Sequence, residues 1–224
     1  MNVPGFFVAI SLLLASPWNA QTSASVKPTV TFTLDFPASN PSHYSISIAQ
    51  DGHGAYQSSA RDSPDSADDS YESQFDISAA NRDRIFALAR QAEYFAGKID
   101  SGNRKLAFTG TKTLSYEDDR RNNRAAFNYS AIAAVQQLTA FFQGLGSTLD
   151  YGRRLSYSHH YQKLALDEEL KQMEAQAQNG ELSEIGAIAP VLQEIYDDPS
   201  VINVVRARAQ RLIEMGKMSA DKGH

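Results

Sequence analysis

The stretch that decides the fold of this chain is Thr29-Val30-Thr31-Phe32-Thr33-Leu34-Asp35-Phe36, which alternates strictly between polar and apolar side chains. Successive side chains of a strand point to opposite faces, so the stretch predicts a strand with one buried and one polar face. The alternation resumes from Tyr44 to Ile48 and reaches Asp51-Gly52, a two-residue hairpin signal. We therefore expect a returning strand from Ala55 to Ser59.

Two later segments join a strand pattern to a helix pattern. A strand ending at Ile77 leads to Ser78, which is well placed to cap a helix that ends near Gly97. A second hairpin, from Lys105 to Tyr116 and from Arg124 to Tyr129, leads in the same way to a helix capped by Ser130 that extends to about residue 146.

These two helix entries resemble each other, because Phe75-Asp76-Ile77-Ser78-Ala79 recurs as Phe127-Asn128-Tyr129-Ser130-Ala131. A duplicated hairpin-plus-helix unit would explain the likeness and would give one antiparallel sheet with two helices on one face. The alternative is that any strand that enters a Ser-capped helix looks similar. Both interpretations stay open.

Helix patterns replace strand patterns after Ser147. One helix is predicted from Tyr161 through Leu164 to Asn179-Gly180, and another from Leu182 to Ile195, kinked or broken at Pro190. Asp198-Pro199 is expected to open a last helix that ends at Gly216.

The order of elements predicts an α+β fold with an antiparallel sheet of about five or six strands, two packed helices and a C-terminal helical subdomain. The predicted divisions are a signal peptide at 1–20, a linker at 21–28, an α+β domain at 29–146, a helical subdomain at 147–216 and a flexible tail at 217–224.

The N-terminal segment has the pattern of an export signal. The first 26 residues carry no charged side chain, and the apolar run from Phe6 to Ala15 has the length of a signal-peptide core. The small residue Ala20 predicts cleavage before Gln21, although the usual Lys or Arg at the start is missing. A buried N-terminal core helix is the alternative. Export predicts a periplasmic or extracellular location.

Composition narrows the function classes. The chain has 224 residues, a formal net charge of −5 and no cysteine, so disulfides, thiol catalysis and thiolate metal sites are not available to it. A net negative charge disfavours a nucleic-acid binder, which usually has a basic face. No apolar stretch after the signal approaches the roughly 18 residues of a spanning helix.

Three histidines are the first candidates for chemistry. The neighbours His159 and His160 point about 100° apart on a helix and are poorly placed to share a metal, so two exposed or partly packed histidines are the favoured interpretation. His53 lies in the glycine-rich turn Asp51-Gly52-His53-Gly54, where hairpin chemistry already explains two of the four residues.

The charged segments each have a structural and a functional interpretation. The acidic group could bind calcium or be a solvated loop; it consists of Asp62, Asp65, Asp68, Asp69 and Glu72. The run from Glu117 to Arg121 predicts a solvated turn. Positive charge at the end of the last helix suits the helix dipole or an anion site; it comes from Arg206, Arg208, Arg211 and Lys217.

Asn128-Tyr129-Ser130 fits the acceptor pattern for N-glycosylation, although Ser130 already has a structural role as a helix cap. Together with Thr109 to Asp118 and Asp198-Pro199-Ser200-Val201, this segment resembles a set of uncharacterised exported bacterial proteins. The resemblance covers most of the chain after the signal and implies a location in the bacterial envelope or outside the cell. It implies no catalytic residue and no substrate.

The first functional hypothesis is a non-enzymatic binding or interaction module, with an unknown protein or small molecule as its partner. The strand from Thr29 could lie at a sheet edge and pair with another chain, or the helical third could bind one. The alternatives are an extracytoplasmic hydrolase that uses His53, His159 or His160 with a carboxylate, and a weak calcium-binding protein. No catalytic residue, cofactor or metal ligand is assigned from the sequence.

Overall fold

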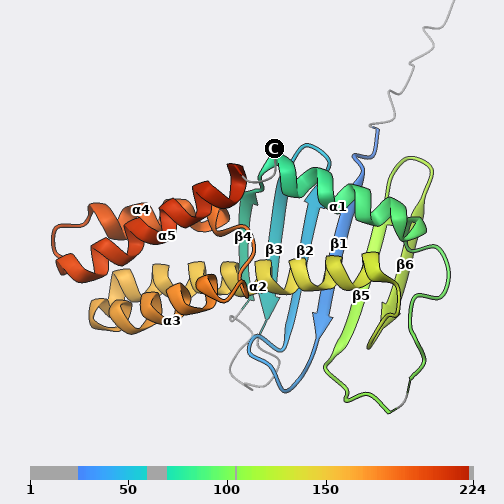
Figure 1. Cartoon of the computed structure of the whole chain (residues 1–224), viewed down its shortest axis with the longest axis horizontal. Helices are drawn as coiled ribbons and strands as arrows, with labels where there is room; N and C mark the ends of the chain where they lie inside the picture. Colours follow the sequence, from blue (N-terminus) through green and yellow to red (C-terminus); the bar gives the residue numbers. More distant parts are fainter. Residues whose placement is uncertain (1–24, 60–69, 104, 222–224) are drawn as a thin grey trace, which may run out of the picture.

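The computed structural model describes residues 25–59, 70–103 and 105–221, and it is built on one antiparallel sheet with the strand order β4-β3-β2-β1-β5-β6 (Figure 1). The strands are β1 (Thr29–Asp35), β2 (His43–Ala49), β3 (His53–Ser59), β4 (Ser70–Asp76), β5 (Thr111–Glu117) and β6 (Asn122–Phe127). The expected α+β class and the sheet of five or six strands are confirmed. The predicted signal peptide lies outside the described residues.

Strand β1 is the centre of the sheet. Thr29 pairs with Ala49 of β2 on one side and with Glu117 of β5 on the other, and both pairings run the full length of the strand. The expectation that this strand lies at an edge is therefore wrong. Alternation identifies the buried face of a strand but does not say how many neighbours it has, and the edges are β4 and β6.

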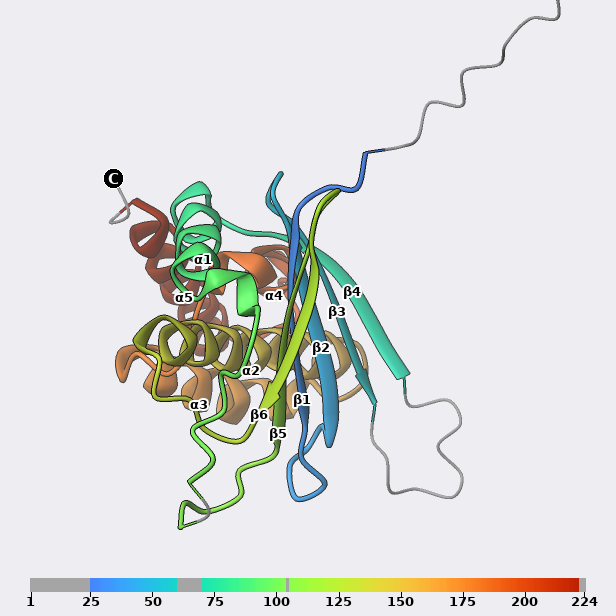
Figure 2. The same cartoon turned by 90° about the vertical axis from the view of Figure 1, so that its right-hand side faces the viewer.

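The alternation predicted for β1 and β2 is confirmed. Val30 and Phe32 of β1 and Ile46 of β2 are buried, whereas the residues between them are only partly covered. The helices of the described residues all lie on the side of the sheet that holds these apolar side chains, and none of them covers the other face (Figure 2). Full burial of each such side chain contributes about 1.5–3 kcal/mol to folding.

Eight helical segments occur in the described residues. They are α1 (Ala79–Gln91), η1 (Glu93–Phe95), α2 (Ala133–Tyr161), η2 (Lys163–Ala165), α3 (Leu166–Gln178), η3 (Ile185–Ile188), α4 (Ala189–Asp197) and α5 (Asn203–Asp221), where η marks a short 3-10 turn. Helices α1 and α2 cross the sheet on one face, as predicted, while α3, α4 and α5 gather beyond the β4 edge (Figure 1).

Ser78 caps α1 as expected, because its Oγ accepts a hydrogen bond from the N–H of Asn81 at 3.4 Å. The same hydroxyl donates to Oε2 of Glu184 at 2.9 Å, and the Asn81 amide donates to that oxygen at 2.7 Å. Glu184 precedes η3, so this cluster ties the start of α1 to the C-terminal helices.

Helix α2 differs most from its prediction. It was expected to end near residue 146, but it continues to Tyr161, so the predicted division between 146 and 147 falls inside one helix. Two of its glycines are positions of close contact with other elements. A Cβ on Gly146 would lie 3.0 Å from the ring of Tyr44, and a Cβ on Gly152 would lie 2.6 Å from Ile188.

The start of α2 also needs a correction. The helix begins at Ala133, and its N-cap residue is Ile132, which makes no side-chain capping bond. Ser130 lies two residues earlier, where its Oγ accepts a hydrogen bond from the N–H of Ile132 at 3.2 Å. The hydroxyl therefore orders the entry into α2 without being its cap.

The C-terminal helices follow the predicted pattern with shifted ends. Asn179-Gly180 closes α3 as predicted, but Leu164 is almost fully exposed rather than part of a buried stripe. Pro190 lies in the first turn of α4, a position that tolerates proline, and does not break a helix. Helix α5 begins four residues after Pro199 and passes Gly216, so the predicted tail is helical up to Asp221.

The two hairpin-plus-helix units, β3-β4-α1 and β5-β6-α2, lie at opposite edges of the sheet with their helices on the same face. Phe75 and Phe127 are both buried near the end of their strands. This arrangement is the one that a duplication would give, and the duplication itself stays a hypothesis. No helix in the described part of the chain combines the length and the apolar character that a membrane crossing needs.

Candidate functional site

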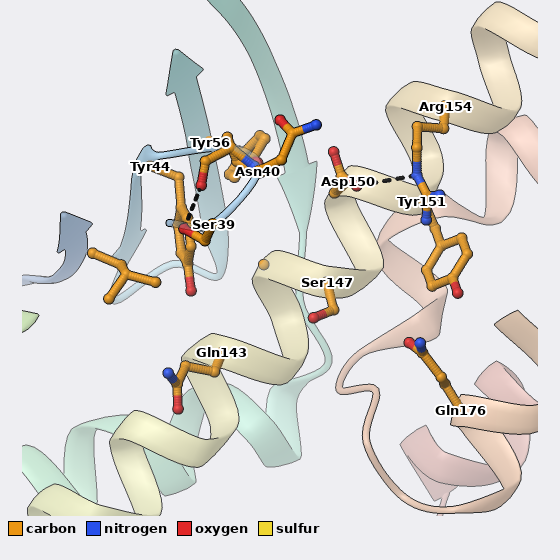
Figure 3. Close-up of a pocket in the computed structure, with 13 residues that line it drawn as sticks. Ser39, Asn40, Tyr44, Tyr56, Gln143, Ser147, Asp150, Tyr151, Arg154 and Gln176 are labelled. Atoms are coloured by element: carbon orange, nitrogen blue, oxygen red, sulfur yellow. Dashed lines mark hydrogen bonds and ion pairs between the residues drawn. The ribbon is translucent and has the colours of Figure 1, made fainter. Parts of the chain in front are cut away.

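A cavity of about 320 Å³ lies between the sheet, the loop that joins β1 to β2, and the middle of α2 (Figure 3). This volume is at the lower end of the range of roughly 300–1,000 Å³ that is usual for ligand pockets. Most of its side chains are polar; they include Ser39, Asn40, Tyr44, Tyr56, Gln143, Ser147, Asp150, Tyr151, Arg154 and Gln176.

Two tyrosines from the sheet line this cavity. Tyr44 of β2 and Tyr56 of β3 lie on the inner face with ring centroids 6.1 Å apart. Burial raises the pKa of Tyr44 well above its usual value and raises the pKa of Tyr56 to about 12. Both hydroxyls are therefore neutral near pH 7 and can act as hydrogen-bond donors and acceptors.

The hydroxyl of Tyr56 has no hydrogen-bond partner in the protein, although the residue is only 1% exposed. After burial, which raises the pKa of this group, a side-chain contact with Ser58 lowers it, Asp150 raises it and Arg153 lowers it; the contact with Ser58 does not have the geometry of a normal hydrogen bond. An unsatisfied buried hydroxyl costs about 1–3 kcal/mol. Tyr56 lines the cavity, and its hydroxyl oxygen is itself covered by protein atoms.

Charged groups of α2 border the same cavity. Arg153 donates to Asp150 Oδ1 from Nε at 3.2 Å and from Nη2 at 2.9 Å. Nε of Arg154 lies 3.1 Å from Asp150 Oδ2 in an ion pair (Figure 3), although its N–H is not aimed at that oxygen, and the guanidinium lies over the ring of Tyr151. The carboxylate is therefore offset by two guanidinium groups.

The arrangement suits hydrogen bonding to a neutral ligand. Hydroxyl groups come from Tyr44, Tyr56 and Ser147, and side-chain amides come from Gln143 and Gln176. A hydroxyl can both donate and accept a hydrogen bond through its oxygen, and a side-chain amide donates through its nitrogen and accepts through its oxygen. No histidine is among the residues that line this cavity.

A second cavity, of about 500 Å³, adjoins the first through Gln143, which lines both. Its wall includes Lys112 of β5, which is 5% exposed. Lys112 Nζ donates to Thr109 Oγ1 at 2.9 Å, to the Asn128 carbonyl at 3.0 Å and to the Thr109 carbonyl at 3.4 Å. Burial lowers the pKa of this lysine, and no ion pair joins it to a carboxylate of the described residues.

The predicted histidines do not gather at either cavity. His53 is exposed at the start of β3, with Nδ1 2.5 Å from Asp76 Oδ1. His160 Nδ1 contacts the Ser156 carbonyl at 2.7 Å. Sequence reasoning missed His43, whose Nδ1 lies 2.7 Å from Asp35 Oδ1. The register of the β1–β2 pair, which places these two residues opposite each other, is the signal that could have found it.

His159 joins the end of α2 to the turn before α5. Its Nε2 lies 2.9 Å from Asp198 Oδ2, the oxygen that also accepts from Lys163 at 2.6 Å. Hydrogen bonds from Lys163 and Ser200 hold the pKa of Asp198 far below its usual value. The cluster cross-links two connections between helices, which is a structural role.

The acidic group from Asp62 to Asp69 lies outside the described residues. Glu72 is an exposed residue of β4 that accepts a hydrogen bond from Gln57 at 3.2 Å. The turn between β5 and β6 is confirmed as a loop whose charges satisfy one another, because Asp118 accepts from the side chain and the backbone of Arg121. No group of three or more potential metal ligands occurs within the described ranges.

The predicted position of the arginines at the end of the last helix is wrong. Because α5 extends to Asp221, they lie in its first half rather than at its end, and the helix dipole does not explain them. Arg208 and Arg211 both donate to Glu174 of α3, at 2.9 and 2.6 Å, and Arg206 donates to the Tyr196 carbonyl at 2.6 Å. They connect the C-terminal helices, while Lys217 is exposed.

No protein-family model, no curated protein and no solved structure matches this chain. The candidate site therefore depends on geometry alone. Sequence reasoning missed Lys112 of the second cavity and Tyr56 of the first. The signal that could have found Lys112 is its place in the alternation of β5, where it shares a face with the buried residues Leu114 and Tyr116. Tyr56 gave a weaker one, as an aromatic residue on the inner face of a returning strand.

Proposed function

We propose that this chain is an exported, non-enzymatic binding module of the bacterial envelope or secreted space, and that it holds a neutral polyhydroxylated molecule such as a sugar unit. The site is the cavity between the sheet and α2. The observation that supports the proposal most strongly is the Tyr56 hydroxyl, which is buried in the cavity wall without a protein partner.

The chemistry of the wall suits such a ligand. Each hydroxyl of a sugar donates one hydrogen bond and accepts others, and the hydroxyl and amide groups of the cavity offer the same mixture. Tyr44, which is 8% exposed, adds apolar ring surface beside its polar group, which suits the C–H face of a sugar ring. The offset of Asp150 by two arginines favours a neutral ligand over a charged one.

Binding of defined sugars tests this function. The purified protein is screened on a glycan array, and monosaccharides from any positive glycan are titrated by calorimetry. We expect Tyr56→Phe to weaken binding about tenfold, which corresponds to about 1.4 kcal/mol. Tyr116→Phe, on the same face of the sheet but outside the cavity, is the matched control and should leave affinity unchanged. Absence of any sugar binding, or equal binding by Tyr56→Phe, would refute the proposal.

Export is the second part of the proposal, and it rests on the apolar run and the small residue Ala20. Expression in a bacterium, followed by cell fractionation and N-terminal sequencing, should recover a chain that starts at Gln21 outside the cytoplasm. A variant that lacks residues 6–15 is expected to stay inside. Recovery of an uncleaved cytoplasmic chain would contradict export.

The two alternatives stay predictions. A hydrolase would need a histidine and a carboxylate beside a substrate cavity, and neither cavity described above is lined by His53, His159 or His160. His160 lines a further cavity of about 460 Å³, whose lining residues include no aspartate or glutamate. Calcium binding depends on the acidic group from Asp62 to Asp69. It predicts a melting temperature that rises with millimolar calcium and falls again with chelator.

A further inference from the structure

The second cavity has a charge that the sugar site does not explain. Lys112 is buried in its wall, and its ammonium group contacts only neutral oxygen atoms of Thr109 and Asn128. Burial of a charged group is costly unless it is paired. The ten residues that line this cavity include no aspartate or glutamate.

The nearby carboxylate of Asp100 does not supply the missing charge. Its Oδ2 accepts from the N–H of Asn128 at 2.7 Å, and its Oδ1 accepts from the N–H of Gly102. Both oxygens thus bind the backbone rather than Lys112. The lysine remains an uncompensated cation at the wall of an open space.

The positive end of α2 lies at the same cavity. Tyr129 and Ser130, which lead into the helix, and Gln136 of its first turn all line the space. The first turn contains no acidic residue, and Ile132 provides no side-chain cap. A helix N-terminus acts as about half a positive charge and favours anions.

We propose that this second cavity binds a small amphipathic monocarboxylate, with its carboxylate against Lys112 and the start of α2. One lysine and one helix terminus match a single negative charge better than a doubly charged phosphate group. Phe127, which pairs with Lys112 across β5 and β6, and Ala140 of α2 give the cavity an apolar surface for the rest of the molecule. The contact of Lys112 to the Thr109 carbonyl, at 3.4 Å, is its longest and the one most easily exchanged for a ligand oxygen.

Calorimetric titration of the full chain with hexanoate, hexanamide and hexyl phosphate tests the site. We expect hexanoate to bind at least tenfold more tightly than hexanamide, which has the same shape without the charge. Equal affinity for the two, or no binding of hexanoate, would overturn the proposal. Tighter binding of hexyl phosphate than of hexanoate would overturn the choice of a monocarboxylate.

Variants locate the binding within the molecule. Lys112→Met should weaken hexanoate binding at least tenfold, whereas Lys98→Met, which removes the same charge from an exposed position, should not. Ala140→Trp fills the cavity from an exposed helix position and keeps Lys112. It therefore tests whether hexanoate binds in this cavity even if Lys112→Met does not fold. Hexanoate binding that survives Ala140→Trp would show that the site lies elsewhere. Sugar binding by these variants should be unchanged, which keeps the two sites experimentally separate.

Discussion

The Tyr56 hydroxyl allows an unusual prediction, because its removal should stabilise the protein while it harms ligand binding. Tyr56→Phe keeps the ring, whose centroid lies 6.1 Å from those of Tyr44 and Tyr71, and removes only an oxygen without a hydrogen-bond partner. The cost of such a buried group, about 1–3 kcal/mol, disappears with it.

We therefore expect the free energy of unfolding of Tyr56→Phe to be unchanged or raised by up to about 2 kcal/mol. Tyr116→Phe is the control within the same sheet. The hydroxyl of Tyr116 interacts with Asp118, so its loss should cost about 0.5–1.5 kcal/mol. Tyr116→Phe should thus be the less stable of the two variants.

Urea unfolding followed by circular dichroism measures both variants. A change in midpoint at a constant slope reports a change in stability rather than in the unfolded state. If Tyr56→Phe is destabilised as much as Tyr116→Phe, the Tyr56 hydroxyl is satisfied within the protein. In that event the main support for the sugar site is lost.

Two further predictions concern the scaffold. Glu174→Gln should lower the free energy of unfolding by about 1–3 kcal/mol, because it weakens charged hydrogen bonds from two arginines of α5. Those arginines hold the pKa of the Glu174 carboxyl below its usual value. The stability that the ionised carboxylate contributes is therefore present above the ordinary carboxyl range and is lost as pH falls through the lowered pKa. The urea midpoint of the unmodified protein should fall in acid, and that of Glu174→Gln should fall less. Gly110→Ala should lower the free energy of unfolding more than Gly180→Ala. Both glycines have a positive φ, 93° and 74°, but only a Cβ at Gly110 would meet another atom, Phe36 Cβ at 2.7 Å. Equal urea midpoints for the two variants would contradict this.

The parts of the fold that were predictable are those that local pattern determines. The alternation from Thr29 to Phe36 identified a half-buried strand, Asp51-Gly52 identified the hairpin, and Ser78 identified a helix start. The position of β1 in the sheet was not predictable, because β5, its second neighbour, arrives about 80 residues later in the chain. Pairing between distant strands leaves no mark on the alternation of either one.

The continuation of α2 past residue 146 was not predictable for a different reason. A glycine in a helix costs roughly 1 kcal/mol relative to alanine, and Gly144 and Gly146 both lie within α2. In the structure their missing side chains allow close approach, of Gly144 to Ser183 and of Gly146 to Tyr44. Packing against the sheet and the C-terminal segment outweighs the local preference, and that gain is visible only once the neighbours are known.

The candidate site shows the same dependence on distant contacts. Its residues come from the β1–β2 loop, β2, β3, α2 and α3, so no local motif connects them. If α2 ended near residue 146, Asp150 and Arg154 would lie on another element and Gln176 would not reach the cavity. The uninterrupted α2 places these groups opposite Tyr44 and Tyr56, and Gly146 allows it to lie close enough to do so. The continuity of α2 across residue 146 is therefore what builds the pocket, and a ligand held there would contact the sheet and the C-terminal helices at once.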